Sequence, residues 1–455
     1  MFLDEPKGLP VGSTTFTARI PTPITSGSVQ FQDNERRGLS LEEVAFTAYY
    51  PAEADIQSKS FVKGLHWVTR PLRTALEGYV RFSGASTWIA WSILLPIVYL
   101  YGRFIPAYLN APLLNPNKAP TPQKQWPLVI FSHGLGGSHT AQICTRLASS
   151  GRVVLAIEHR DGTATSCVTR SWDSEGKCST RPILYIRESD ATYGEDDKDA
   201  LMPLRRDQLV IRHYEIYTAF DYFSRFVRKQ ADPRLKVEGD SGFKADSWTD
   251  NGDAELPVRL DDVCLAGHSF GGCTTYSILS SNPPEGFLRI PITHALIYDP
   301  WLEPLPLPGP VPLSSSGIKA DPAPLFSKSS SSGPEFSLPK MLVINSESFT
   351  LWKDHFTRLE GVVQKWGSES KLLTLVRSKH PDFSDFPVLP LIQRKGPVKI
   401  MEIIEQLSLS FLNDKLNQKL ELEKTRKMEV EIVGRRKDGR PKRRIVGELG
   451  DIVVH

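Results

Sequence analysis

The most constraining feature of this chain is a short apolar run, Val263 to Ala266, that leads into the pentapeptide Gly267-His268-Ser269-Phe270-Gly271. Helix-forming spacing resumes directly afterwards with Tyr276 and Leu279. This order of strand, sharp turn and helix is typical of a nucleophile elbow, in which the turn lifts one serine out of the backbone. The glycines suit such a turn because the strained backbone packs closely and leaves no room for a Cβ. The simpler alternative is a Gly-rich turn that carries an inert serine.

Length and composition are those of an ordinary globular protein: 455 residues, 40% hydrophobic and 24% charged, enough for a large core. A net charge of +3 does not suggest a general nucleic-acid partner. The five cysteines are odd in number and lack metal-ligand spacing, and the N-terminus shows no apolar signal region. Neither a Gly-x-Gly-x-x-Gly loop nor a His-Glu-x-x-His motif is present. We therefore expect a cytoplasmic protein without a cofactor or a metal.

The order of the expected elements predicts the fold class. Residues 11–23 and 43–50 are rich in β-branched and aromatic side chains and predict short antiparallel strands, whereas 51–125 shows no strong strand. From Trp126 onwards strands alternate with helices. The strands are expected at 127–131, 152–157, 294–299, 341–344 and 372–376, and the helices before 150, at 203–230, near 350–365 and after Pro397. This pattern predicts an α/β fold with a mostly parallel, doubly wound sheet and antiparallel N-terminal strands.

We expect a single domain over 1–423 with three insertions: about 60–110, a polar loop at 231–258 and a Pro/Ser-rich loop at 303–338. Within the first insertion, 87–101 is the most hydrophobic window of the chain. At 15 residues it falls short of the roughly 20 needed to span a bilayer. Its Trp and Tyr content favours a peripheral membrane contact, and a buried lid or core helix is an equal alternative.

The last stretch, 424–455, is basic, with Arg435-Arg436-Lys437 and Lys442-Arg443-Arg444 as its densest runs. Such runs are usually solvated tails, and we expect one here. Binding to an anionic membrane or to a nuclear-import receptor is the alternative.

A serine nucleophile needs a base within hydrogen-bond reach, and the base needs an orienting carboxylate. In this fold class the chain order is serine, acid, histidine. Three histidines lie far enough beyond the elbow. His355 falls in a helical pattern and His455 ends the tail, whereas His380 follows the strand at 372–376, where such sheets present catalytic groups. The pattern therefore predicts His380 as the base.

Two carboxylates are candidates for the acid, because Asp299 ends one strand and Glu347 ends the next. The pattern favours neither. For the oxyanion, the N–H of Phe270 lies at the positive end of the helix that follows the elbow. A second donor is expected in the Gly-rich loop His133–Gly137, from the N–H of Leu135.

With these residues in hand, the chain resembles the platelet-activating factor acetylhydrolase family, the group VII type of phospholipase A2. The resemblance covers residues from about 106 to 386. It rests on Pro106-Ala107-Tyr108, Phe131-Ser132-His133-Gly134-Leu135-Gly136, Glu158-His159-Arg160-Asp161, Gly267-His268-Ser269-Phe270-Gly271-Gly272, Asp299-Pro300-Trp301 and His380-Pro381-Asp382-Phe383-Ser384-Asp385. The insertion at 303–338 and the basic C-terminal stretch depart from the secreted members of that family.

The resemblance implies an α/β-hydrolase fold, and it favours Asp299 over Glu347. The implied roles are Ser269 as nucleophile, His380 as base, Asp299 as acid, and the N–H groups of Leu135 and Phe270 as oxyanion donors. The implied substrates are phospholipids with short or oxidised sn-2 acyl chains, such as 1-alkyl-2-acetylglycerophosphocholine, cleaved without calcium.

We therefore expect a serine carboxylester hydrolase with a phospholipid substrate, peripheral membrane contact through 87–101 and no nucleic-acid partner. One alternative is a carboxylesterase for small soluble esters, with 87–101 as a lid. The other is a catalytically silent hydrolase fold that binds lipid.

Overall fold

A computed structural model gives the structure of this chain. It describes residues 3–31, 34–54, 62–86, 88, 91–92, 95–96, 99, 104–137, 140–193, 201–239, 242–249, 255–313, 338–388 and 395–455. The chain divides into two compact units. Unit 1 comprises Met1–Val263 and Pro283–Pro291, and unit 2 comprises Cys264–Asn282 and Ile292–His455. Strand β11 (Val258–His268) begins in unit 1 and ends in unit 2.

The sheet of unit 1 combines parallel and antiparallel strands in the order β5-β6-β2-β1-β4-β3. β5 and β6 are parallel, whereas β2 runs antiparallel to both β6 and β1. The predicted antiparallel opening to a mixed sheet is thus confirmed. These strands are β1 (Val11–Phe31), β2 (Asn34–Pro51), β3 (Lys63–His66), β4 (Phe104–Leu109), β5 (Trp126–Ser132) and β6 (Val153–Glu158).

The first two strands are longer than predicted. Pro21 and Pro23 indicate an end to the first strand, because proline cannot donate to a strand ladder. In the structure, the register between β1 and β2 shifts between Arg19 and Ile24. Both prolines lie within this irregular stretch, and the pairing of the two strands resumes after it.

Six further strands in the described part of unit 1 are absent from the prediction, and two of them, β9 (Ala191–Thr192) and β10 (Leu235–Val237), pair antiparallel with β1. β3 and β4 lie in the region 51–125, where no strong strand was expected, and β4 pairs with β1 in parallel. Both are short and contain Gly64 or Pro106, which interrupts the strand signal. β7 (Ser166–Trp172) and β8 (Cys178–Leu184) form a hairpin that is largely polar in sequence.

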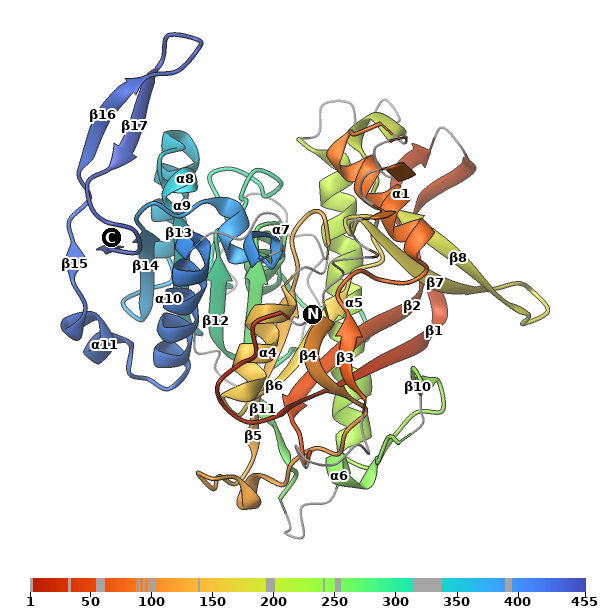
Figure 1. The fold of residues 1–455 in the computed structure, drawn as a ribbon. Helices are drawn as coiled ribbons and strands as arrows, with labels where there is room; N and C mark the ends of the chain where they lie inside the picture. The colour runs from red at the N-terminus through yellow and green to blue at the C-terminus, as the bar shows by residue number, and fades with distance from the viewer. Residues whose placement is uncertain are drawn as a thin grey trace. The chain divides into compact units, whose positions relative to one another are not determined.

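The core of unit 1 packs the predicted long helix against the first two strands. Figure 1 shows α5 (Pro203–Val227) running alongside β1 and β2. The rings of Phe16 and Phe46 stack at 5.2 Å, and Phe223 of α5 meets both edge-on. The shorter helices of this unit are α1 (Leu72–Ser83), α4 (Ala141–Ser149) and α6 (Asp246–Thr249). α6 and the short strand β10 (Leu235–Val237) lie in the predicted polar loop 231–258.

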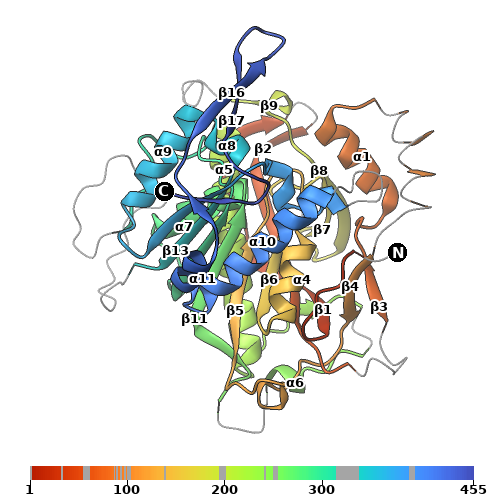
Figure 2. The same cartoon turned by 60° about the vertical axis from the view of Figure 1, so that its left-hand side comes forward.

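The sheet of unit 2 has the strand order β15-β18-β14-β13-β12. β12, β13 and β14 are parallel, so their carboxyl ends share one edge. Figure 2 shows α10 beside this sheet, and Tyr298 Oη lies 2.9 Å from Ser408 Oγ of that helix. The elements here are α7 (Phe270–Leu279), β12 (Ile292–Tyr298), β13 (Lys340–Ser346), α8 (Glu347–Thr350), α9 (Lys353–Gln364), β14 (Ser370–Leu375), α10 (Lys395–Leu412) and α11 (Leu416–Leu422). The strand–helix alternation and the elbow between β11 and α7 are those of an α/β-hydrolase fold.

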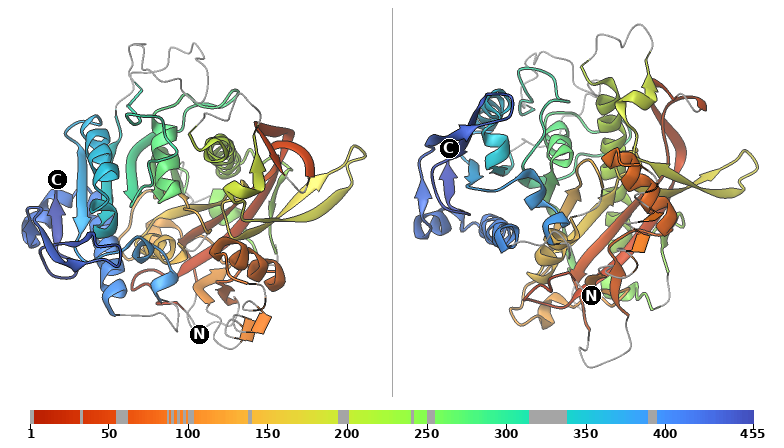
Figure 3. Two further views of the ribbon diagram at one scale, coloured as in Figure 1. Left: turned by 90° about the horizontal axis from the view of Figure 1, so that it is seen from above. Right: turned by 45° about the horizontal axis from the view of Figure 1, so that its top comes forward.

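The structure differs from the solvated tail predicted for 424–455. β18 (Ile452–Val454) pairs antiparallel with β14, and Ile452 and Val453 are buried. His455 Nε2 lies 2.8 Å from Thr374 Oγ1. Figure 3 shows this C-terminal end within unit 2. The apolar residues 452–454 cover the edge of β14. The free energy gained by burying them outweighs the solvation of the surrounding charges, which is why this segment joins the sheet. The preceding residues form β15 (Thr425–Arg426), β16 (Val430–Arg435) and β17 (Pro441–Ile445).

Two predicted insertions lie largely outside the described residues. These are 314–337 of the Pro/Ser-rich loop and most of the window 87–101, of which Trp88, Trp91, Ser92, Leu95, Pro96 and Tyr99 are described. No helix in the described part of the chain is long and apolar enough to cross a membrane.

Candidate active site

The serine of the elbow lies between β11 and α7 in a strained backbone conformation, with φ 57° and ψ −116°. Such a conformation persists only when surrounding structure enforces it. Here the end of β12 does so. Ser269 N–H donates to the carbonyl of Tyr298 at 2.9 Å, and the Ser269 carbonyl accepts from Trp301 N–H at 3.1 Å. The elbow is therefore held in place by the neighbouring strand.

Two glycines of the elbow have no room for a side chain. A Cβ on Gly267 would lie 2.2 Å from the carbonyl oxygen of Gly271, and a Cβ on Gly272 would lie 2.9 Å from Pro300 Cβ. The first contact is with backbone, which cannot move aside. The sequence pattern at these positions thus reflects close packing around the serine.

Three side chains that follow strands form a hydrogen-bonded chain. Ser269 Oγ lies 3.0 Å from His380 Nε2, and His380 Nδ1 lies 2.6 Å from Asp299 Oδ2. Ser269 follows β11, Asp299 follows β12 and His380 follows β14. The structure brings together the three residues that the sequence pattern and the resemblance single out. With Nδ1–H donating to the carboxylate, Nε2 is free to accept the serine proton.

Asp299 is fully buried, and both of its oxygens are engaged. Oδ1 accepts from the backbone N–H of Ser346 at 2.6 Å. With its amide nitrogen turned toward the carboxylate, Asn345 donates to the same oxygen at 2.8 Å. These donors fix the orientation of the buried carboxyl group, with Oδ2 facing the imidazole.

Two aromatic rings fix the plane of the His380 imidazole. Phe349 stacks on it with centroids 4.3 Å apart and planes at 5°, and His268 lies at 4.8 Å. The backbone N–H of His380 donates to Ser348 Oγ at 3.2 Å. Sequence reasoning missed Phe349, which belongs to α8 and follows β13. Its position three residues after a strand's carboxyl end is the signal that was available.

The other residues weighed in the sequence have different partners. Glu347 accepts from the backbone N–H groups of Arg377 at 2.6 Å and Ile445 at 3.2 Å. His355 Nε2 accepts from the N–H of Leu302 at 3.2 Å, and burial lowers the pKa of this imidazole to about 4. His455 contacts Thr374 in the sheet.

In unit 1, the loop after β5 is tied to α5 by buried polar contacts. Ser132 Oγ lies 2.8 Å from His159 Nε2, and His159 Nδ1 lies 2.5 Å from a carboxylate oxygen of Glu215. This chain looks like a second catalytic relay, but its residues are at most 1% exposed. Arg212 also donates to the same serine oxygen at 3.3 Å. A serine enclosed in this way is inaccessible to an ester, so the contacts stabilise the loop.

Arg212 also holds the backbone of this Gly-rich loop. Its guanidinium donates to the carbonyl of His133 at 2.7 Å and to Asp161 Oδ2 at 2.7 Å. The orientation of the peptide that precedes Leu135 is thereby restrained. Among the described residues, the Leu135 N–H has no hydrogen-bond partner.

Sequence reasoning did not find these helical partners of the loop. The available signal was a polar stripe on the predicted helix, recurring every three or four residues. All of its members are buried: Arg205, Gln208, Arg212 and Glu215.

Comparison with known proteins identifies the family. Residues 18–308, more than half of the chain, match the family model described as platelet-activating factor acetylhydrolase, isoform II. The chain belongs to this family. The matched residues include Ser269 and Asp299, whereas His380 lies beyond them.

Relatives within the platelet-activating factor acetylhydrolase family are distant in sequence. The chain is 28% identical to the platelet-activating factor acetylhydrolase of Bos taurus over 340 residues, which covers 74% of this chain and 62% of the relative. It is 29% identical to a putative phospholipase A2 of Schizosaccharomyces pombe over 190 residues, covering 39% and 41%. The chain thus spans less than two thirds of the bovine relative.

Among solved structures, a ferulic acid esterase from Streptomyces cinnamoneus is similar, with 15% identity and a TM-score of 0.46. The alignment covers 92% of this family member and 90% of the esterase. Within the described residues, no group of three or more His, Cys, Asp or Glu side chains is placed to hold a metal ion.

Proposed function

We propose that this protein is a serine-dependent, calcium-independent phospholipase A2 of the acetylhydrolase type, which cleaves short or oxidised sn-2 acyl esters of phospholipids. The hydrogen-bonded chain Ser269–His380–Asp299 carries the proposal. Membership of the platelet-activating factor acetylhydrolase family supports the substrate class.

In this mechanism, Ser269 Oγ attacks the sn-2 carbonyl carbon while His380 Nε2 takes the serine proton. Asp299 stabilises the imidazolium that forms. Collapse of the tetrahedral intermediate breaks the ester C–O bond, and His380 returns the proton to the departing lysophospholipid oxygen. Water then attacks the acyl-enzyme with the same base, which releases the short acid and restores Ser269.

We further propose that the backbone N–H groups of Leu135 and Phe270 stabilise the oxyanion. Phe270 begins α7, where the helix dipole favours negative charge. The N–H of Leu135 has no hydrogen-bond partner among the described residues, and it lies in a loop restrained by Arg212. Donors held in place before the reaction need no reorganisation when the charge develops.

The central test compares the wild type with Ser269→Ala on a panel of phospholipids with sn-2 chains from acetyl to long acyl, with EDTA present. We expect turnover that favours short chains, persists in EDTA and is lost in the variant. Labelling by a fluorophosphonate probe is expected for the wild type alone. Undiminished hydrolysis by the variant contradicts the role of Ser269. If only soluble esters are hydrolysed, the protein is a carboxylesterase for small esters. If neither hydrolysis nor labelling is found, the protein is a catalytically silent hydrolase fold.

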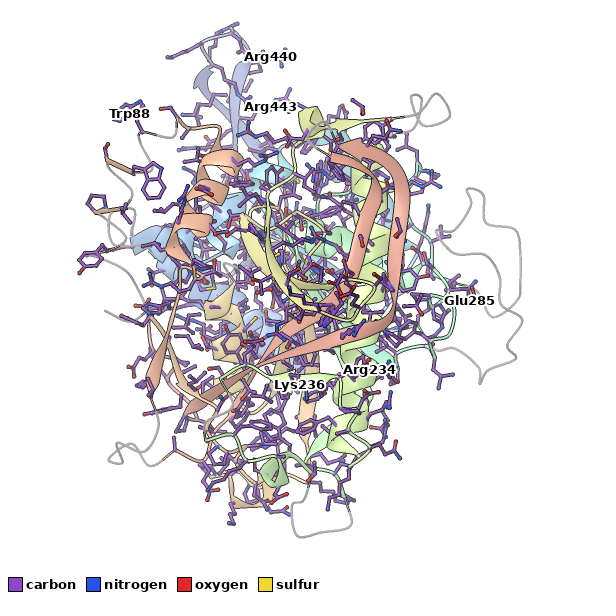
Figure 4. All side chains as sticks on the ribbon, turned by 90° about the vertical axis from the view of Figure 1, so that its right-hand side faces the viewer. Trp88, Arg234, Lys236, Glu285, Arg440 and Arg443 are labelled. Carbon is purple, nitrogen blue, oxygen red and sulfur yellow. The ribbon has the colours of Figure 1, made fainter. Side chains whose placement is uncertain are left out.

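We also propose a peripheral membrane contact through 87–101. Trp88 and Tyr99 are 62% and 81% exposed, and Figure 4 shows Trp88 extending outward from its segment. Aromatic rings of this kind settle at headgroup depth in a bilayer. Replacing Trp88 and Trp91 by Ser should weaken binding to neutral phosphatidylcholine vesicles. Unchanged vesicle binding contradicts this contact and leaves the lid as the alternative.

A cytoplasmic location stays a prediction. All five cysteines are free thiols, and four of them are buried, which fits a reducing compartment. Imaging of the full chain carrying an internal tag in an exposed loop tests it, and a secreted protein contradicts it.

A further inference from the structure

The strands β16 and β17 form a two-stranded hairpin that extends away from the sheet of unit 2 (Figures 1 and 2). Val430 pairs with Ile445 and Ile432 with Arg443. Between Val430 and Ile445 the sequence has seven basic and two acidic residues, a net charge of +5. Because the whole chain has a net charge of +3, the remainder of the chain is slightly acidic. The positive charge of this protein is therefore concentrated on the hairpin.

Within the part of the chain that the structure describes, most of these cations have no carboxylate partner. Arg444 pairs with Glu431 at 2.6 Å within the hairpin, and Arg440 lies 3.6 Å from Asp438. No ion pair is found for Arg436, Lys437, Lys442 or Arg443 among the described residues, and all four are exposed. Figure 4 shows Arg440 and Arg443 on this hairpin. The exposed cations are available to an external anionic surface.

The hairpin also exposes aliphatic side chains between its charges. Ile432 is 68% exposed, Val430 43% and Val433 38%. A two-stranded hairpin with no core of its own is marginally stable in water. Exposed aliphatic groups beside cations are suited to the boundary between headgroups and acyl chains, where both kinds of side chain find partners.

The base of the hairpin is fixed at the edge of the sheet that presents the candidate site. Ile445 is fully buried and packs with Val376 and Val453. Its backbone N–H donates to Glu347, whose other oxygen accepts from the N–H of Arg377, three residues before His380. The hairpin therefore stands at the carboxyl edge of β13 and β14, next to the loop that holds the imidazole.

We propose that the β16–β17 hairpin docks this protein on anionic phospholipid bilayers, with its cations on the headgroups and Ile432 at the acyl boundary. Docking would bring the carboxyl edge of β13 and β14, with the loop that carries His380, toward the lipid. The aliphatic side chains favour a bilayer over a nucleic acid, which offers cations their phosphates but gives aliphatic groups no apolar phase. This binding does not depend on the proposed hydrolysis.

The first experiment measures flotation of full-length Ser269→Ala protein with phosphatidylcholine vesicles, with and without phosphatidylserine. We expect preference for the anionic vesicles and its loss in high salt. The test variant replaces Arg436, Lys437, Lys442 and Arg443 with Gln, because these cations form no ion pair with any described residue. Each cation near such a surface strengthens binding about fivefold, so the affinity should fall at least about 30-fold even where only two of the four cations contact the bilayer.

A matched control removes the same charge elsewhere on unit 2, by changing Lys353, Lys365, Lys395 and Lys415 to Gln. These exposed lysines also have no ion pair among the described residues. We expect affinity within about threefold of the wild type for this control. Equal losses in the two variants overturn the proposal, because net charge alone would then account for binding. A further variant, Ile432→Ser, should weaken binding that remains at high salt.

Two more readouts separate the alternatives. With active protein, the hairpin variant should hydrolyse a monomeric soluble ester at the wild-type rate and act more slowly only on anionic vesicles. Failure of all hydrolysis with vesicle binding intact refutes the proposed function and leaves this inference standing. A short DNA duplex that binds through the hairpin, without any preference for anionic vesicles, overturns the inference in favour of a nucleic-acid partner.

Discussion

Replacing Asp299 with Asn should disable the histidine while leaving the fold intact. In the structure, Oδ1 of Asp299 accepts the Ser346 N–H at 2.6 Å. The amide oxygen of Asn must occupy this position, so its NH₂ group faces His380 Nδ1. The imidazole then has to accept at Nδ1 and keep its proton on Nε2. In that tautomer Nε2 cannot take the proton of Ser269.

The expected loss is about 10,000-fold in kcat/KM, or about 5 kcal/mol of transition-state stabilisation. Steady-state hydrolysis of a short-chain sn-2 ester measures it, and fluorophosphonate labelling should slow in parallel because it uses the same nucleophile. The thermal melting temperature should stay close to that of the wild type, since the side chains have the same shape.

Glu347→Gln is the matched control at the other carboxylate. It should lower stability by about 1–3 kcal/mol, because one buried acceptor is lost, and change kcat little. If Asp299→Asn retains more than a tenth of the activity while Glu347→Gln abolishes it, the acid is Glu347 and the reasoning from the observed hydrogen bonds is wrong.

Three further predictions concern the surroundings of the site. Phe349→Ala should lower kcat about tenfold with a small change in KM, because the stacked ring that orients His380 is lost. An equal fall of kcat in Phe349→Tyr, which keeps an aromatic ring, would argue against orientation by stacking. Arg212→Met should destabilise the protein by about 3–5 kcal/mol in urea unfolding, because it leaves Asp161 buried without its ion-pair partner. Arg212→Lys should destabilise the protein less. An unchanged urea midpoint in Arg212→Met would show that the pair is solvated. Burial lowers the pKa of His355 to about 4 in the folded protein, below the unfolded value of about 6.5. The contribution of neutral His355 to stability is therefore complete above pH 6.5 and falls by up to about 3 kcal/mol as the pH drops toward 4. The urea midpoints of wild type and His355→Asn should converge over that pH range, and parallel curves would contradict this prediction.

Much of the candidate site could be predicted because its signals are local. The elbow can be recognised from consecutive residues, because a strand before Gly267 and a helix after Gly271 flank a turn that has no room for larger side chains at its glycines. His380 follows from strand order, because parallel strands bring their carboxyl ends to one edge. Pattern alone left Asp299 and Glu347 equal, and the resemblance favoured Asp299. The structure separates them through contacts with distant residues.

The parts that could not be predicted depend on long-range packing. Glu347 is directed away from the imidazole by the backbone of Ile445, a residue inside a stretch whose charges suggested a tail. The strands β3 and β4 lack a periodic pattern because Gly64 and Pro106 interrupt them. Pairing of β4 with β1 and of β3 with β4 supplies their stability. The buried Arg212 breaks the usual rule that charge marks the exposed face of a helix.

The carboxylate of Glu347 bonds two amide hydrogens from distant parts of the chain, those of Arg377 and Ile445. Neither amide can exchange with solvent while this side chain keeps its place, so opening at the base of the hairpin also exposes the segment that leads to the imidazole. In deuterium exchange the two amides should therefore be protected by similar opening free energies and lose protection together in Glu347→Gln. One side chain would thus join two segments of unit 2 into a single unit of local unfolding.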